Sequence, residues 1–103
     1  MDAQLKRGIL NICVLKLLEN DSMYGYELVK TIQQYFRDTE ESTLYAILRR
    51  LNKEGLTDMY YSDVSNGPVR KYYSITELGR KHLKEYIDSW KYIENVFEQL
   101  GVL

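Results

Sequence analysis

Residues 41–55, ESTLYAILRRLNKEG, decide the fold. Apolar side chains recur in this stretch at the i, i+3, i+4 and i+7 spacing that defines one face of an α-helix. They are Leu44, Ile47, Leu48 and Leu51. Acidic residues stand near its start, where they suit the positive end of a helix dipole, and Gly55 suits a C-terminal cap. The sequence therefore predicts a helix over 41–54 with one face in the core.

The opposite face of this helix combines small residues near its start with cations near its end. At 100° per residue, the positions that point away from the core are Ser42, Ala46, Arg49, Arg50 and Lys53. Small side chains let a helix approach base edges in a major groove, and the cations can reach phosphates. The pattern favours a DNA recognition helix, with a merely solvated basic face as the alternative.

The segments around this helix give it a context. A helix over 4–18 is apolar on more than one face, so it must be covered on two sides, and an amphipathic helix follows over 24–36. Two β-rich segments at 59–61 and 69–75, joined through the turn pair Asn66-Gly67, predict a hairpin. Three helices and a hairpin are the order of a winged helix-turn-helix, a mainly α fold with a small β-hairpin. The hairpin, or wing, carries the cations Arg70 and Lys71.

A long helix is expected from Thr76, a good N-cap, to about residue 100. Its apolar residues alternate in spacings of three and four, which is typical of a coiled-coil seam. The seam residues are Leu83, Tyr86, Trp90, Ile93, Phe97 and Leu100. Roughly 25 helical residues span about 37 Å, more than the small domain needs. We therefore expect a DNA-binding domain over 1–75 and a dimerisation helix over 76–103.

Composition excludes several classes of function. The chain has 103 residues, a net charge of −1, one His and one Cys, so a disulfide within the chain and a zinc tetrad are both impossible. No close set of acid, base and nucleophile can be assembled, so an enzyme is not expected, and neither is a cofactor. No apolar run reaches the ~18 residues of a membrane span, and a free thiol suits the cytoplasm.

Several motifs resemble the PadR-like family of transcriptional regulators, named for control of phenolic acid decarboxylase. Tyr24-Gly25-Tyr26-Glu27-Leu28 is similar to its second-helix signature, and residues 42–56 are similar to its recognition helix and the following turn. Residues 70–79, RKYYSITELG, resemble its wing strand and the start of its last helix. Departures are Ser42 where many members have Gly, Ala46 where many have Pro, and Pro68-Val69 in place of a more basic wing.

The resemblance implies a homodimeric bacterial or archaeal repressor on a near-palindromic operator, with recognition helices about one DNA turn, roughly 34 Å, apart. It places Ser42, Thr43 and Tyr45 on the DNA at the head of the recognition helix. With the projected cations and the wing, the predicted DNA-binding set is Ser42, Thr43, Tyr45, Arg49, Arg50, Lys53, Gly67, Arg70 and Lys71. The chain resembles the small subfamily in which the first and last helices form the dimer. The predicted interface therefore adds Leu5, Ile9 and Ile12 to the seam.

Trp90 is the single tryptophan, and it lies on the seam between Tyr86 and Ile93. Packing alone is the simpler explanation of a large aromatic residue at such a position. Around Asp88-Ser89-Trp90, however, the chain resembles multidrug-responsive members of the family that bind flat drugs at the dimer centre. Two Trp90 rings, with Tyr86 and Ile93, would then hold a planar aromatic or cationic molecule.

Three functions are therefore compared: a repressor released by such a ligand, a repressor without a ligand, and a winged-helix module that binds protein instead of DNA. The near-neutral charge favours the last, whereas the basic helix face and wing oppose it.

Overall fold

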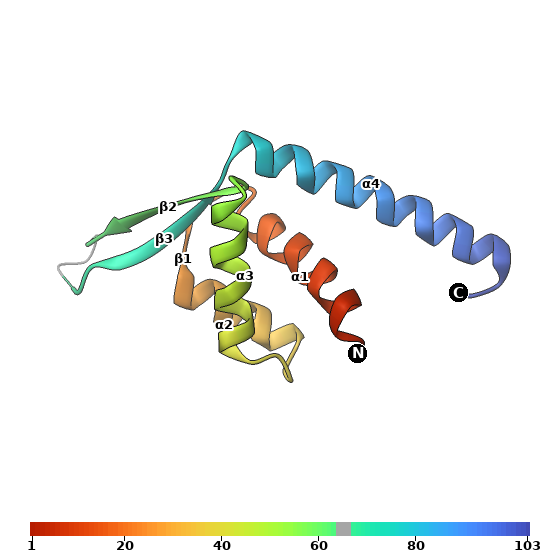
Figure 1. The fold of residues 1–103 in the computed structure, drawn as a ribbon, viewed down its shortest axis with the longest axis horizontal. Helices are drawn as coiled ribbons and strands as arrows, with labels where there is room; N and C mark the ends of the chain where they lie inside the picture. The colour runs from red at the N-terminus through yellow and green to blue at the C-terminus, as the bar shows by residue number, and fades with distance from the viewer. Residues whose placement is uncertain (64–66) are drawn as a thin grey trace.

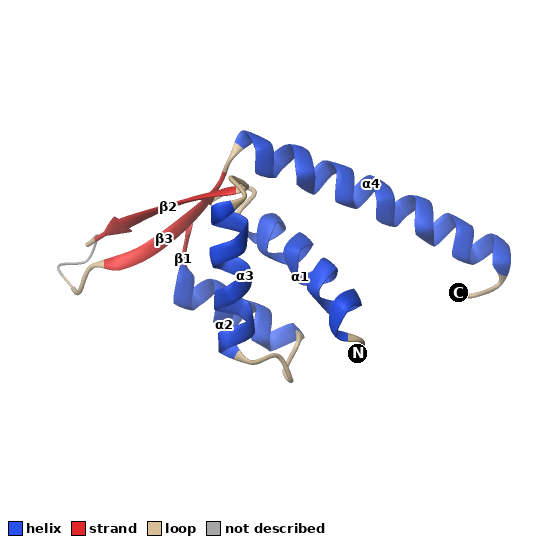
Figure 2. Cartoon of the chain, in the orientation of Figure 1, coloured by secondary structure: helices blue, strands red, loops and turns tan. Residues whose placement is uncertain are grey.

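The computed structural model describes residues 1–63 and 67–103. These residues form four helices and a small antiparallel sheet (Figures 1 and 2). In chain order the elements are α1 (Ala3–Leu17), β1 (Met23–Tyr24), α2 (Gly25–Tyr35), α3 (Glu41–Lys53), β2 (Thr57–Ser62), β3 (Arg70–Ile75) and α4 (Glu77–Leu100). The predicted winged helix-turn-helix with a long last helix is confirmed.

The core lies among α1, α2 and α3 and is closed by the sheet and the start of α4. The predicted apolar face of α3 is confirmed, because all four of its residues are at most 5% exposed. α1 buries Leu10, Val14 and Leu15, which lie between the other helices and α4. The helix that was expected to need cover on two sides is therefore packed against α2 and α3 as well as α4.

The end of α3 is fixed by a Schellman motif. Gly55 has φ +80°, and its N–H donates to the carbonyl of Asn52 at 3.1 Å. The N–H of Leu56 donates to the carbonyl of Leu51 at 2.9 Å. These two bonds satisfy carbonyls that the helix leaves without partners, and the left-handed conformation suits glycine. The predicted capping role of Gly55 is confirmed.

The sheet has the order β1-β3-β2, and all its neighbours are antiparallel. The hairpin is confirmed, with a register from Thr57↔Ile75 to Ser62↔Arg70, so its first strand is longer than the predicted 59–61. β1 was not predicted. Tyr24 was assigned to a helix, but it pairs with Tyr72 in the sheet and precedes α2. Asn66 of the predicted turn pair lies outside the described residues.

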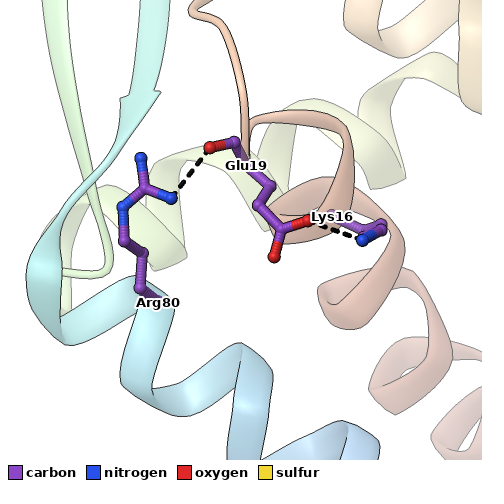
Figure 3. A network of polar contacts seen from close by, with 3 residues as sticks. All are labelled: Lys16, Glu19 and Arg80. Atoms are coloured by element: carbon purple, nitrogen blue, oxygen red, sulfur yellow. Dashed lines mark hydrogen bonds and ion pairs between the residues drawn. The ribbon is translucent and has the colours of Figure 1, made fainter.

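The start of α4 is attached to the ends of α3 and α1. Thr76 caps α4: its Oγ1 accepts from the N–H of Gly79 at 2.9 Å and donates to the carbonyl of Gly55 at 2.7 Å. Arg80 donates to the backbone carbonyl of Glu19 at 2.8 Å, just after α1, and the Glu19 carboxylate pairs with Lys16 (Figure 3). These bonds fix the first turn of α4 to the ends of α3 and α1.

The second half of α4 extends beyond the rest of the chain (Figure 1). Leu83 is 2% exposed and belongs to the core, so its predicted place in a dimer seam is wrong. The reason is that the first turns of α4 pack on α1. Tyr86 also packs partly against the core, whereas Leu100 is 72% exposed. None of the helices among the described residues combines the length and apolar character needed to cross a membrane.

Candidate nucleic-acid interface

The outer face of α3 carries most of the residues predicted to contact DNA. Ser42 and Thr43 are exposed in its first turn, Arg49 is exposed further along, and Lys53 is exposed at its end. This face therefore offers small polar groups at one end and cations toward the other, as predicted. Gly67 lies apart from these residues near the wing tip, exposed, with open space among the described atoms where a Cβ would stand.

A pocket of about 360 Å³ lies between α3, the wing and the start of α2. We call it the wing pocket; its lining is Tyr24, Gly25, Tyr26, Tyr45, Arg49, Tyr61, Val69, Arg70, Lys71 and Tyr73. Four residues predicted to contact DNA, two from α3 and two from β3, are brought together here. Three cations on one concave surface give it the charge that a contact with a phosphate backbone requires.

A row of tyrosine rings lies beside one of these cations, Arg70. The Arg70 guanidinium lies 4.9 Å from the centre of the Tyr24 ring, in a cation–π arrangement. The Tyr24 ring contacts Tyr72 at a centroid distance of 5.9 Å, and Tyr72 stacks on Tyr60 at 5.6 Å. The Tyr60 hydroxyl is 2.7 Å from Ser22 Oγ. Arg70 is therefore positioned by a row of rings that crosses the sheet.

Sequence reasoning did not find this role for the Tyr24-Gly25-Tyr26 segment. At Gly25 the close neighbour is the strand β3. A Cβ on Gly25 would stand 3.1 Å from the Tyr73 ring and 3.6 Å from the Lys71 carbonyl oxygen. The signal that was available is the resemblance of this segment to a family signature, because two residues of strand have no periodicity to detect.

Tyr45 remains a hydrogen-bond donor over a wide pH range. It lies in the wing pocket and packs partly against the core. Burial, with a smaller contribution from the nearby Glu41 carboxylate, raises the pKa of the Tyr45 hydroxyl above its ordinary value. The hydroxyl therefore stays protonated at neutral pH and can donate to a phosphate or base acceptor.

Lys30 joins α2 to the start of the recognition helix. Its ammonium group pairs with the Glu41 carboxylate and lies 5.3 Å from the centre of the Tyr26 ring. The hydrogen bond to Glu41 raises the pKa of Lys30. This pair neutralises one of the two carboxylates at the start of α3, a position where a free negative charge would oppose nucleic acid.

The predicted orientation of Arg50 is wrong. Its guanidinium donates to Asn11 Oδ1 of α1, and the side chain is half-buried instead of facing solvent beside Arg49. The helical projection placed Arg50 on the solvent-facing side with Arg49, but Arg50 lies at the edge of that face, where a neighbouring helix decides its direction. α1 lies beside this edge and supplies the acceptor.

Metal chemistry has no support in the described residues, where no three His, Cys, Asp or Glu side chains are arranged to hold an ion. Cys13, the single cysteine, is half-buried on α1, and burial raises the pKa of its thiol.

A recognition helix with a polar outer face, beside a wing whose cations share a pocket with it, defines a winged-helix DNA-binding protein. The model of the transcriptional regulator PadR-like family matches residues 14–85, which cover α2, α3, the wing and the start of α4. The chain belongs to this family, as the motifs predicted. It is therefore a DNA-binding transcriptional regulator and not an enzyme.

The similarity to known proteins extends over nearly the whole chain. A relative from Lysinibacillus sphaericus, named Uncharacterized protein X, is 37% identical over 95 residues, which are 89% of this chain and 87% of that protein. The crystal structure of a PadR-like transcriptional regulator from Bacillus cereus is 33% identical with a TM-score of 0.84, covering 95% of this chain and 96% of that one. A Streptococcus transcriptional regulator is 30% identical with a TM-score of 0.86, covering 97% and 99%.

Proposed function

We propose that the protein is a cytoplasmic, homodimeric repressor that binds a near-palindromic operator and is released by a planar aromatic or cationic ligand. The observation that carries the DNA-binding part is the wing pocket, in which cations of α3 and β3 face the same space. In this proposal α3 enters a major groove and the wing follows the adjacent backbone. Dimer symmetry gives the operator its two half-sites.

The proposed contacts divide by chemistry. The first turn of α3 and Tyr45 read base edges, and the exposed cations bind phosphates. Base contacts are assigned to Ser42, Thr43 and Tyr45, and phosphate contacts to Arg49, Lys53, Arg70 and Lys71. Gly67 lets the tip of the wing approach the backbone without a side chain. Arg50 contributes only its positive charge, at the side of α3, because its guanidinium donates to Asn11.

The proposed dimer rests on the free part of the α4 seam. Trp90, Ile93 and Phe97 are only half-covered by their own chain, and Leu100 is exposed. On α1, Leu5 is 51% exposed, while Ile9 and Ile12 are half-buried. Residues 1–75 would then serve as the DNA-binding domain and 76–103 as the dimerisation helix, with the first turns of that helix packed in the domain.

The proposed ligand site is formed by Trp90 with Tyr86 and Ile93, where α4 leaves the domain. A planar cationic dye is expected to quench the Trp90 fluorescence saturably through stacking and cation–π attraction. Trp90→Ala should weaken dye affinity, followed by the dye's own fluorescence, by at least about tenfold with the dimer intact. Tyr92→Ala, an exposed position on the other side of α4, is the matched control. Unchanged dye affinity in Trp90→Ala would favour the repressor without a ligand.

The experiment that tests DNA binding is a salt-dependent titration against the DNA upstream of the protein's own gene, with a scrambled duplex as control. Specific binding of one dimer per site, with a steep salt dependence, is expected. Lys71→Gln should weaken binding to both duplexes and reduce the salt slope by about one per lost contact, whereas Lys81→Gln on the outside of α4 should not. No binding even at low salt would favour the protein-interaction module.

A further inference from the structure

The recognition helix has a second concave flank, on the side away from the wing. A pocket of about 650 Å³ lies between the first turns of α1 and the first turns of α3. We call it the α1 pocket; Lys6 and Arg7 line it from α1, and Thr43, Ala46 and Arg50 line it from α3. In Figure 1 the N-terminal ends of α1 and α3 lie at the same end of the molecule.

The two pockets lie on opposite sides of the exposed face of α3. Tyr45 belongs to the wing pocket and Thr43 to the α1 pocket, and residues two apart point in directions that differ by about 160° around a helix axis. Ser42 lies between them, near the centre of the exposed face. A molecule that covers this face therefore meets cations on both sides of the helix.

A helix in the major groove of DNA has one phosphodiester strand on each side. Because the groove is only about 12 Å wide, both strands lie close to the helix. In the proposed complex the wing pocket takes one strand, so the other strand passes along the α1 pocket. We infer that Lys6 and Arg7 bind the phosphates of this second strand. The inference rests on the proposed insertion of α3 into the groove, and it adds α1 to the DNA interface.

The charges in the α1 pocket determine where the strand passes. Asp38 and Glu40 line the pocket from the loop between α2 and α3, whereas Lys6 and Arg7 line it from α1 and Arg50 from α3. Their carboxylates repel phosphate and so confine it to the α1 side. The Glu40 carboxylate also accepts a hydrogen bond from Ser42 Oγ at 3.5 Å.

The contact is made by side chains and not by the positive end of α1. Asp2 Oδ1 already accepts from the N–H groups of Gln4 and Leu5, both at 3.0 Å. This cap places a carboxylate at the helix end and occupies the donors that an anion would need. Arg7 is exposed, Lys6 is half-buried, and both side chains line the α1 pocket, so neither cation is enclosed by the protein.

The test compares the operator affinity of the full-length Lys6→Gln/Arg7→Gln variant with that of the wild type as salt is varied. Each lost phosphate contact lowers the slope of log K against log salt by about 0.9, so the slope should fall by about 1.8 per protomer. Affinity at low salt should fall at least about tenfold on operator and scrambled duplex alike, because phosphates carry no sequence information. Lys16→Gln, at the other end of α1 and paired with Glu19, should change neither quantity.

The outcomes separate this inference from the function on which it rests. An unchanged slope in the double variant, together with a reduced slope in Lys71→Gln, overturns the α1 contact and leaves the repressor proposal intact. The single variant Arg7→Gln should lower the salt slope by half as much as the double variant. Because Arg7 is exposed, this substitution should not disturb folding, so misfolding would not explain the lower slope. A wild-type protein that binds neither duplex overturns both.

Discussion

Gly79 determines at the residue scale how closely α4 can approach the end of α3. A Cβ at this position would stand 2.1 Å from the backbone oxygen of Leu56 and 2.8 Å from the Ile75 side chain. Because a backbone atom cannot give way as a flexible side chain can, Gly79→Ala should lower the free energy of unfolding by about 1–3 kcal/mol. Urea denaturation at fixed protein concentration measures this loss.

A second glycine substitution supplies the control for that measurement. Gly8 lies within α1, and apart from its chain neighbours and its own helix backbone, no atom of the described residues stands within 4 Å of where its Cβ would be. Gly8→Ala should therefore raise stability by about 0.5–1 kcal/mol, because alanine has less conformational freedom to lose in a helix. If Gly79→Ala instead behaved like Gly8→Ala, the close approach of α4 to Leu56 would be wrong.

At the scale of elements, β3 carries a buried tyrosine whose ionisation opposes folding. Tyr73 is 4% exposed, and burial raises the pKa of its hydroxyl. The unfolded chain releases this proton near the ordinary value of about 10, before the folded protein does. The stabilising contribution is thus complete below that pH and is lost as pH rises through the folded pKa.

Tyr73→Phe should therefore reduce the loss of stability in alkali. Urea midpoints at about pH 8 and about pH 11 would give the pH dependence. We expect a smaller difference between the two midpoints in Tyr73→Phe than in the wild type. Tyr35→Phe, at a position that is 79% exposed, should leave the difference unchanged. Equal pH dependence in the wild type and Tyr73→Phe would contradict the assignment of this proton to β3.

The elements that could be predicted from the sequence are those with a long periodic pattern. The apolar stripe of α3 extends over two turns, and the hairpin has β-formers on both sides of a turn, so both were found. β1 was not found because two residues define no period. The row of tyrosines beside Arg70 was also not found, because it depends on the pairing of β1 with β3, two strands far apart in the chain.

The candidate site was predictable in composition but not in all orientations. A helical projection gives the direction of a side chain from its own helix, and it placed Arg49 correctly. It cannot show that a second helix, α1, stands at the edge of the face. Because Asn11 of α1 accepts from the Arg50 guanidinium, Arg50 does not point to solvent as the projection predicted. The α4 seam has the same limit, since periodicity shows that Leu83 is covered but not by which chain.

At the scale of the whole molecule, α4 extends beyond the domain on which it packs (Figure 1). Its first turns bury Leu83 against α1, and the same face continues for four further turns with Ile93, Phe97 and Leu100. α4 ends in a Schellman motif at Gly101, where the N–H of Val102 donates to the Phe97 carbonyl at 2.8 Å. A capped helix with a partly exposed apolar stripe is the surface on which the proposed dimer depends.

If that surface is a second copy of the chain, a charge within the stripe should separate the protomers. We expect Ile93→Lys/Phe97→Lys to shift the protein from dimer to monomer in sedimentation velocity, since two desolvated ammonium groups per protomer oppose association. Operator affinity should fall with dimer loss, because a monomer binds one half-site, while secondary structure is retained. Tyr92→Lys adds one such charge to α4, at a position that is 71% exposed and about 100° or more around the helix from Ile93 and Phe97, so this variant should remain dimeric. A dimer that persists in the double variant would place the interface elsewhere, and dissociation by Tyr92→Lys would show that net charge, and not the stripe, controls assembly.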